Sequence, residues 1–231
     1  MEEKLKSALE PIHWSLLLRS LVVLAAWYFL SPLTTTLVLV VVYFTPLYRS
    51  GAFLPALLVL TFAVFSVEPD LLRMFILGGA IYLLLGVKNL VVVDRASAYQ
   101  ALVILLFFFL WSQFFLMVKG AYSGIMFLSL VFIALLFYFF SWRTLNLKET
   151  NFYPIHYKLV LCLGSFLIFQ WGLVLMILPW PTYAKIATAL LGTGLTLEVT
   201  TQRFYQQLED RSLALYFSLL FISIAALIVL F

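Results

Sequence analysis

Apolar runs fill most of the chain, and short polar or proline-containing breaks separate them. A membrane-spanning helix needs about 20 mostly apolar residues, with a range of about 17 to 25. Divided at charged residues, proline and glycine, the pattern predicts nine helical segments at about 13–31, 33–48, 52–67, 70–93, 97–118, 121–141, 155–178, 182–201 and 211–231. The second and third segments are short for a full crossing. The pattern predicts an all-α, polytopic integral membrane protein with about nine transmembrane helices.

Most breaks between these segments are only a few residues long, as at Ser31-Pro32 and 179–181. Short connections make neighbouring helices antiparallel partners. We therefore predict a single transmembrane helical domain over 1–231. It begins with a short amphipathic segment, 1–12, and carries two sizeable cytoplasmic loops at about 142–154 and 202–210.

Composition supports the membrane assignment, because 65% of the 231 residues are hydrophobic and only 10% are charged. Soluble domains are about one-quarter charged, so a water-soluble fold of this length is excluded. The formal charge of +4 does not indicate nucleic-acid binding, since the basic residues are scattered singly along the chain. Cys162 is the only cysteine, and we expect it to be a small buried apolar residue.

The basic residues predict the orientation of the chain, because cytoplasmic loops of membrane proteins are enriched in lysine and arginine. With the N-terminus in the cytoplasm, three basic residues lie toward the outside: Arg73, Lys119 and Lys185. The remaining eleven of the 14 lie toward the inside: Lys4, Lys6, Arg19, Arg49, Lys88, Arg95, Arg143, Lys148, Lys158, Arg203 and Arg211. This positive-inside bias predicts N-in and C-out for nine helices, in the plasma or inner membrane. A count of eight helices would place the C-terminus inside.

Three ionisable side chains, Arg19, Lys88 and Glu198, lie inside apolar segments near the predicted cytoplasmic face. A charge within the bilayer normally reaches the interface, pairs with another charge or lines a watery cavity. Lys88 is six residues from Asp94, or roughly 9 Å along a helix, which a lysine side chain can largely cover by snorkelling. The alternative is an intramembrane charge cluster in which Glu198 pairs with Lys88 or with Arg19.

Both histidines occur in similar four-residue sequences, each at the start of a predicted span. The sequence PIHW includes Pro11, His13 and Trp14, and the sequence PIHY includes Pro154, His156 and Tyr157. Each span is followed by a proline-containing break, so helices 1–2 and 7–8 are candidates for a parallel structural repeat, a feature that recurs in transporters. A shared way of starting a helix at the interface is the alternative explanation. Two histidines without neighbouring carboxylates make a poor metal site, and we predict no metal.

Recognised catalytic motifs are absent from the sequence, and we predict neither a catalytic residue nor a cofactor. Gly120 and Gly124 form a GxxxG pattern, in which small residues let helices pack closely. We expect helix packing from this pair rather than chemistry.

These observations favour a non-enzymatic scaffold or accessory subunit that acts through helix–helix and lipid contacts. The expected partners are membrane lipids, together with another membrane protein or a second copy of the chain, and not nucleic acid. A small-molecule or ion transporter or channel, with its site in the cytoplasmic leaflet, is the alternative. A third hypothesis is a lipid-modifying enzyme that uses Glu198 or a histidine.

Overall fold

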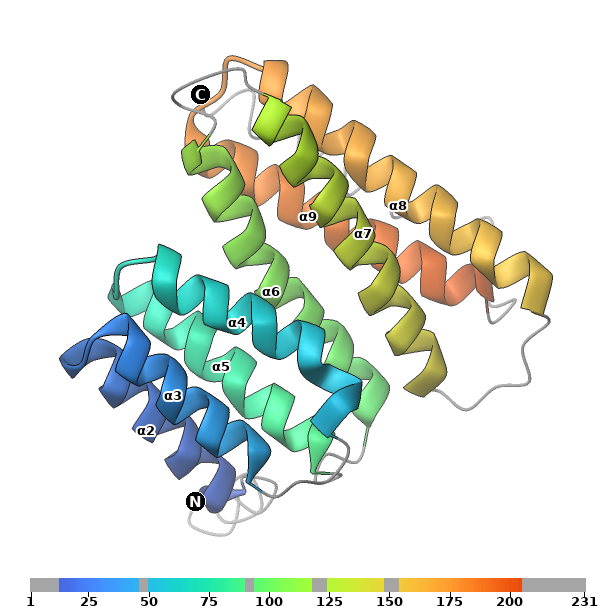
Figure 1. Ribbon diagram of the computed structural model, residues 1–231. Coiled ribbons are helices and arrows are strands. Elements are labelled where there is room, and N and C mark those ends of the chain that lie inside the picture. The colour runs from blue at the N-terminus through green and yellow to red at the C-terminus, as the bar shows by residue number, and fades with distance from the viewer. Residues whose placement is uncertain (1–12, 46–49, 90–93, 118–123, 148–153, 205–231) are drawn as a thin grey trace, which may run out of the picture. The chain divides into compact units, whose positions relative to one another are not determined.

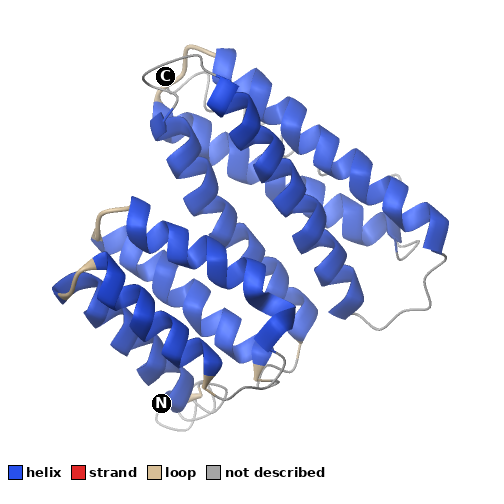
Figure 2. Ribbon diagram, viewed as in Figure 1, coloured by secondary structure: helices blue, strands red, loops and turns tan. Residues whose placement is uncertain are grey.

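A computed structural model describes residues 13–45, 50–89, 94–117, 124–147 and 154–204 (Figure 1). Every regular element in these ranges is helical (Figure 2). The chain divides into two compact units, Met1–Leu106 (unit 1) and Phe107–Phe231 (unit 2). The single domain predicted over 1–231 stays a prediction.

Unit 1 is a group of apolar helices joined by short turns. In chain order they are α2 (Trp14–Phe29), α3 (Pro32–Phe44), the 3-10 helix η1 (Ser50–Phe53), α4 (Leu54–Ser66) and α5 (Leu71–Lys88), followed by the first part of α6 (Arg95–Met117). Helix α2 packs against both α3 and α5, and α3 packs against α4 (Figure 1). A Cβ on Gly78 of α5 would lie 2.7 Å from Cδ1 of Leu24, so α5 and α2 pack closely at this glycine.

Unit 2 contains the rest of α6 together with α7 (Gly124–Leu147), α8 (Pro154–Ile177) and α9 (Thr182–Phe204). Helices α7, α8 and α9 all contact one another. The core of this unit is aromatic: the Phe107 ring meets Phe137 and Phe140 edge-on, and Trp111 stacks on Phe115 at 5.7 Å between ring centroids.

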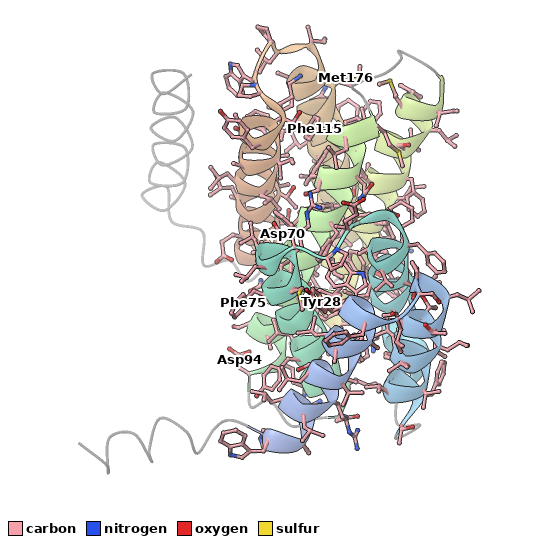
Figure 3. The ribbon with its side chains drawn as sticks, turned by 90° about the vertical axis from the view of Figure 1, so that its left-hand side faces the viewer. Tyr28, Asp70, Phe75, Asp94, Phe115 and Met176 are labelled. Carbon is pink, nitrogen blue, oxygen red and sulfur yellow. The ribbon has the colours of Figure 1, made fainter. Side chains whose placement is uncertain are left out.

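Capping residues explain where several helices begin. Ser31 accepts a hydrogen bond from the Thr34 amide at 3.4 Å, and Pro32 follows at the first helical position of α3. Asp70 accepts from the Leu71 amide at 2.7 Å at the start of α5, and Asp94 from the Ser97 amide at 3.1 Å near the start of α6. Figure 3 labels Asp70, directly before α5, and Asp94, directly before α6.

The described helices confirm eight of the nine predicted segments as helical, and the ninth, 211–231, lies outside the described residues. The boundaries differ at several ends. The predicted loop at 142–154 begins inside α7, which continues to Leu147 because Thr144 and Leu145 are buried. The loop predicted at 202–210 likewise begins inside α9, which continues to Phe204.

Among the described residues, four helices are long and apolar enough to cross a membrane: α5, α6, α7 and residues Tyr157–Ile177 of α8. Helices α2, α3 and Gly51–Ser66 are apolar but shorter, and α9 is the least apolar of the described helices. Large apolar side chains lie on the surface of both units, including Phe75 of α5 and Tyr28 of α2 (Figure 3). Such outward apolar faces suit lipid rather than water, and the protein is a helical membrane protein.

Cys162 differs from the expectation of a buried residue, since its side chain is exposed on α8. The neighbouring Leu159, Leu163 and Phe166 are also exposed. This face of α8 is therefore an outward apolar surface, on which a cysteine is as acceptable as a small apolar residue.

Candidate functional site: basic side chains at helix C-termini

Lys88, the last residue of α5, is fully buried and has its ammonium at the end of α3. Its Nζ donates a hydrogen bond to the backbone carbonyl of Tyr43 and lies 4.5 Å from the centroid of the Tyr43 ring. The last four carbonyls of a helix lack partners within that helix, and Tyr43 O is one of them. Lys88 thus caps the C-terminus of α3 while its charge also faces an aromatic ring.

Arg19 of α2 reaches the same end of α3. Its Nη1 donates to the carbonyl of Thr45, the C-cap residue of α3, at 2.8 Å. Arg19 and Lys88 are close enough to act on each other electrostatically. Two cations from α2 and α5 therefore converge on one helix end, although they are far apart in sequence.

Two more basic side chains donate to backbone carbonyls elsewhere. Arg73 Nη1 donates to the carbonyl of Glu68, two residues beyond the end of α4, at 3.3 Å. Lys185 Nζ of α9 donates to the carbonyl of Met176, in the last turn of α8, at 3.2 Å. A helix C-terminus carries about half a negative charge, so a nearby cation is stabilising by about 0.3–1 kcal/mol. Arg19, Lys88 and Lys185 therefore stabilise the ends of neighbouring helices, whereas Arg73 stabilises the turn between α4 and α5.

The third residue of the predicted charge cluster, Glu198, lies half-buried in α9 of unit 2. The structure brings Arg19 and Lys88 together within unit 1, whereas the contact of either with Glu198 stays a prediction. For Lys88 the described residues add a contact that was not predicted: its ammonium is buried and donates to the backbone carbonyl of Tyr43. Snorkelling of Lys88 to the interface also stays a prediction.

The two histidine-containing sequences, PIHW and PIHY, both lie at helix starts. His13 is the N-cap residue of α2 and makes no side-chain capping hydrogen bond, and Trp14, the first helical residue, is 64% exposed. Pro154 is the first residue of α8, and Tyr157 is half-buried one turn later. Pro11 lies outside the described residues. These positions agree with the helix-start role, and the parallel repeat of helices 1–2 and 7–8 stays a prediction.

The GxxxG pair is described only at Gly124, the first residue of α7, because Gly120 lies outside the described residues. A Cβ on Gly124 would meet no atom of the described residues within 4 Å. Close helix contacts occur instead at other glycines, most tightly at Gly192 and Gly172 in unit 2. Packing through Gly120 and Gly124 therefore stays a prediction.

A buried polar cluster in unit 2 was not predicted from the sequence. The indole nitrogen of Trp111 donates to Oγ1 of Thr193 at 3.0 Å, and this hydroxyl donates to Ala189 O at 2.7 Å. Four further threonines of α9 donate to carbonyls of their own helix: Thr188, Thr196, Thr200 and Thr201. The recurrence of threonine in an otherwise apolar segment was the available signal. Hydroxyls held in this way are packing elements and not activated nucleophiles.

Ser141 of α7 is an exception to this pattern. It is fully buried, and its hydroxyl has no hydrogen-bond partner within the part of the chain that the structure describes. A buried hydroxyl without a partner costs about 1–3 kcal/mol. Such a group calls for a polar partner from outside these residues, such as a water molecule or a ligand.

Replacing Lys88 with methionine tests the capping role. Methionine keeps much of the side-chain volume but leaves the buried carbonyl of Tyr43 without its charged donor, so we expect the free energy of unfolding to fall by about 1–3 kcal/mol. Unfolding by dodecyl sulfate in mixed micelles measures this change. Lys185→Met is the matched control on a less buried cap and should cost less. Equal stability of Lys88→Met and the unchanged chain would show that the cap contributes nothing.

No protein-family model, curated protein or solved structure matches the chain. The assignment of a function therefore rests on the residues and their contacts.

Proposed function

We propose that this chain is a non-enzymatic, multi-spanning membrane protein that serves as a scaffold or accessory subunit through helix–helix and lipid contacts. The observation that carries the proposal is that basic side chains donate hydrogen bonds to backbone carbonyls of the chain. Arg19, Lys88 and Lys185 donate to backbone carbonyls at the ends of neighbouring helices, and Arg73 donates to a carbonyl of the turn between α4 and α5. Charges used in this way hold the helices together. The surface left for partners is the outward apolar face of the helices.

The proposed topology has nine transmembrane helices, with the N-terminus in the cytoplasm and the C-terminus outside, in the plasma or inner membrane. Support comes from the distribution of basic residues along the chain, eleven toward the inside and three toward the outside. The agreement of the described helices with the predicted segments is consistent with this topology.

Cysteine labelling in intact cells tests the topology. In a background in which Cys162 is replaced by alanine, single cysteines at Lys119 and Lys185 should react with a membrane-impermeant maleimide. A cysteine at Lys148 should react only after the cells are opened. Labelling at Lys148 in intact cells, with protection at Lys119, would reverse the orientation.

Purification from the membranes of the cell that makes the protein tests the scaffold role. After gentle solubilisation, we expect one membrane protein, or a second copy of the chain, to accompany it in a fixed ratio measured by quantitative mass spectrometry. Phe132→Ala on the outward face of α7 should lower that ratio if α7 makes the contact, and Phe166→Ala on α8 is the matched control. A chain that elutes alone with lipid would argue against the proposal.

Transport is the second candidate, and Ser141 is the observation that favours it. A buried hydroxyl that lacks a partner among the described residues is the kind of group that a polar solute could satisfy. Glu198, half-buried in α9, adds an ionisable group to the same unit. Solute or ion flux across proteoliposomes that contain the purified chain, abolished by Ser141→Ala, would move the assignment to transport.

A further inference from the structure

We propose that Arg19 forms a binding site for the phosphate of an anionic phospholipid at the end of α3. The proposal concerns a lipid ligand and does not depend on whether the chain is a scaffold. It begins from the chemistry of the guanidinium group. An arginine side chain has five N–H donors in a planar fork, and the contact with Thr45 O uses Nη1. The other donors can form the paired hydrogen bonds that arginine makes with a phosphate.

The position of Arg19 suits a lipid headgroup. It lies five residues after Trp14, about 7.5 Å along α2, and Trp14 is 64% exposed at the start of this helix. Exposed tryptophan at the end of an apolar helix is typical of the membrane interface. The Arg19 side chain is itself only partly buried, and its contact with Thr45 is on the surface of unit 1.

The electrostatics of this helix end favour an anion. The C-terminus of α3 carries about half a negative charge, which a single cation balances. Here two cations, Arg19 and Lys88, donate to its carbonyls, whereas the end of α8 receives only Lys185 among the described residues. Lys88 is buried and cannot touch the lipid directly, but it adds positive potential next to Arg19. Basic groups between membrane helices bind anionic lipid headgroups in this way.

Native mass spectrometry of the full chain, released from detergent and titrated with phosphatidylglycerol or phosphatidylcholine, tests the site. We expect phosphatidylglycerol to bind more tightly and Arg19→Gln to weaken its binding about fivefold, which corresponds to about 1 kcal/mol for one basic residue near the membrane surface. Arg73→Gln is the matched control, because Arg73 also donates to a carbonyl, at the other end of α5. It should leave binding unchanged.

A second measurement keeps the test independent of any effect of the variant on folding. The thermal midpoint of the unchanged chain should rise with phosphatidylglycerol and not with inorganic phosphate at the same concentration. Equal effects of the two anions would overturn the lipid assignment and indicate a general phosphate site. Equal binding of the two lipids, or equal losses for Arg19→Gln and Arg73→Gln, would overturn the site itself.

Discussion

Trp111→Ala should lower the free energy of unfolding by about 3–5 kcal/mol, the largest effect expected from a single substitution in unit 2. Trp111 is fully buried in α6, where its ring stacks on Phe115 and meets Phe114 edge-on at 5.8 Å. Alanine removes these contacts and leaves a cavity. It also removes the donor to Thr193 Oγ1. Unfolding by dodecyl sulfate in mixed micelles measures the change.

Two variants separate the causes of that loss. Trp111→Phe keeps an aromatic ring but not the N–H donor, so we expect a smaller loss, in which the hydrogen bond accounts for about 0.5–1.5 kcal/mol. Trp14→Ala removes the same kind of side chain from an exposed position and should change the unfolding free energy by less than about 0.5 kcal/mol. Equal effects of Trp111→Ala and Trp14→Ala would show that unit 2 is not packed around Trp111.

Gly192→Ala should destabilise unit 2 by about 1–3 kcal/mol, because the added methyl group has no room. A Cβ at Gly192 would lie 2.3 Å from the indole nitrogen of Trp171 and 2.7 Å from its Cδ1. The indole would have to move, and its hydrogen bond to Thr188 O, 3.2 Å long, would be lost or weakened. Unfolding in mixed micelles again gives the magnitude.

Gly124→Ala is the control for this substitution. It makes the same chemical change in a helix, at a position where a Cβ would meet no described atom within 4 Å, so stability should be unchanged or slightly higher. Combining Gly192→Ala with Trp171→Leu should cost less than the sum of the two single changes, since the smaller side chain relieves the contact. Strict additivity would mean that Gly192 and Trp171 do not pack against each other.

Much of the helical architecture could be predicted because apolar run length alone identifies helices in a membrane protein. The end of α3 shows that apolar run length does not predict where a helix ends. The predicted segment continued to 48, but the helix ends at Phe44 because Thr45 precedes a proline and adopts an extended conformation, with φ −107° and ψ 108°. The end of α5 differs similarly, since Asn89 serves as its C-cap in place of the predicted continuation to 93.

The hydrogen bond of Lys88 to the carbonyl of Tyr43 could not be predicted, for a physical reason. Charged residues are visible in a sequence, and a search for partners therefore leads to other charges, here Glu198. The observed acceptor is a backbone carbonyl, Tyr43 O, which lies 45 residues away and has no signature of its own. A helix carbonyl is left without a partner in its own helix only in the last turn, so the contact depends on the exact end of α3.

The packed and lipid-facing sides of each helix could not be predicted either. Segments that are apolar all round give little sign of which side is packed and which side faces lipid. The burial of Trp111 and the exposure of Cys162 both follow from helix packing within unit 2. The sequence shows that the segment forming α9 is rich in threonine. The contact of Thr193 with Trp111, however, depends on the packing of α6 against α9.

Site-specific photocrosslinking in the membranes of the producing cell tests the scaffold function most directly. A photoreactive amino acid at Leu128, which is exposed on α7, should give a discrete protein adduct of constant mass, whereas the same probe at the buried Leu130 should crosslink only within the chain. This result is expected if the outward apolar faces are the working surface of the protein. Lipid adducts alone at Leu128, together with solute flux by the purified chain in liposomes, would contradict it.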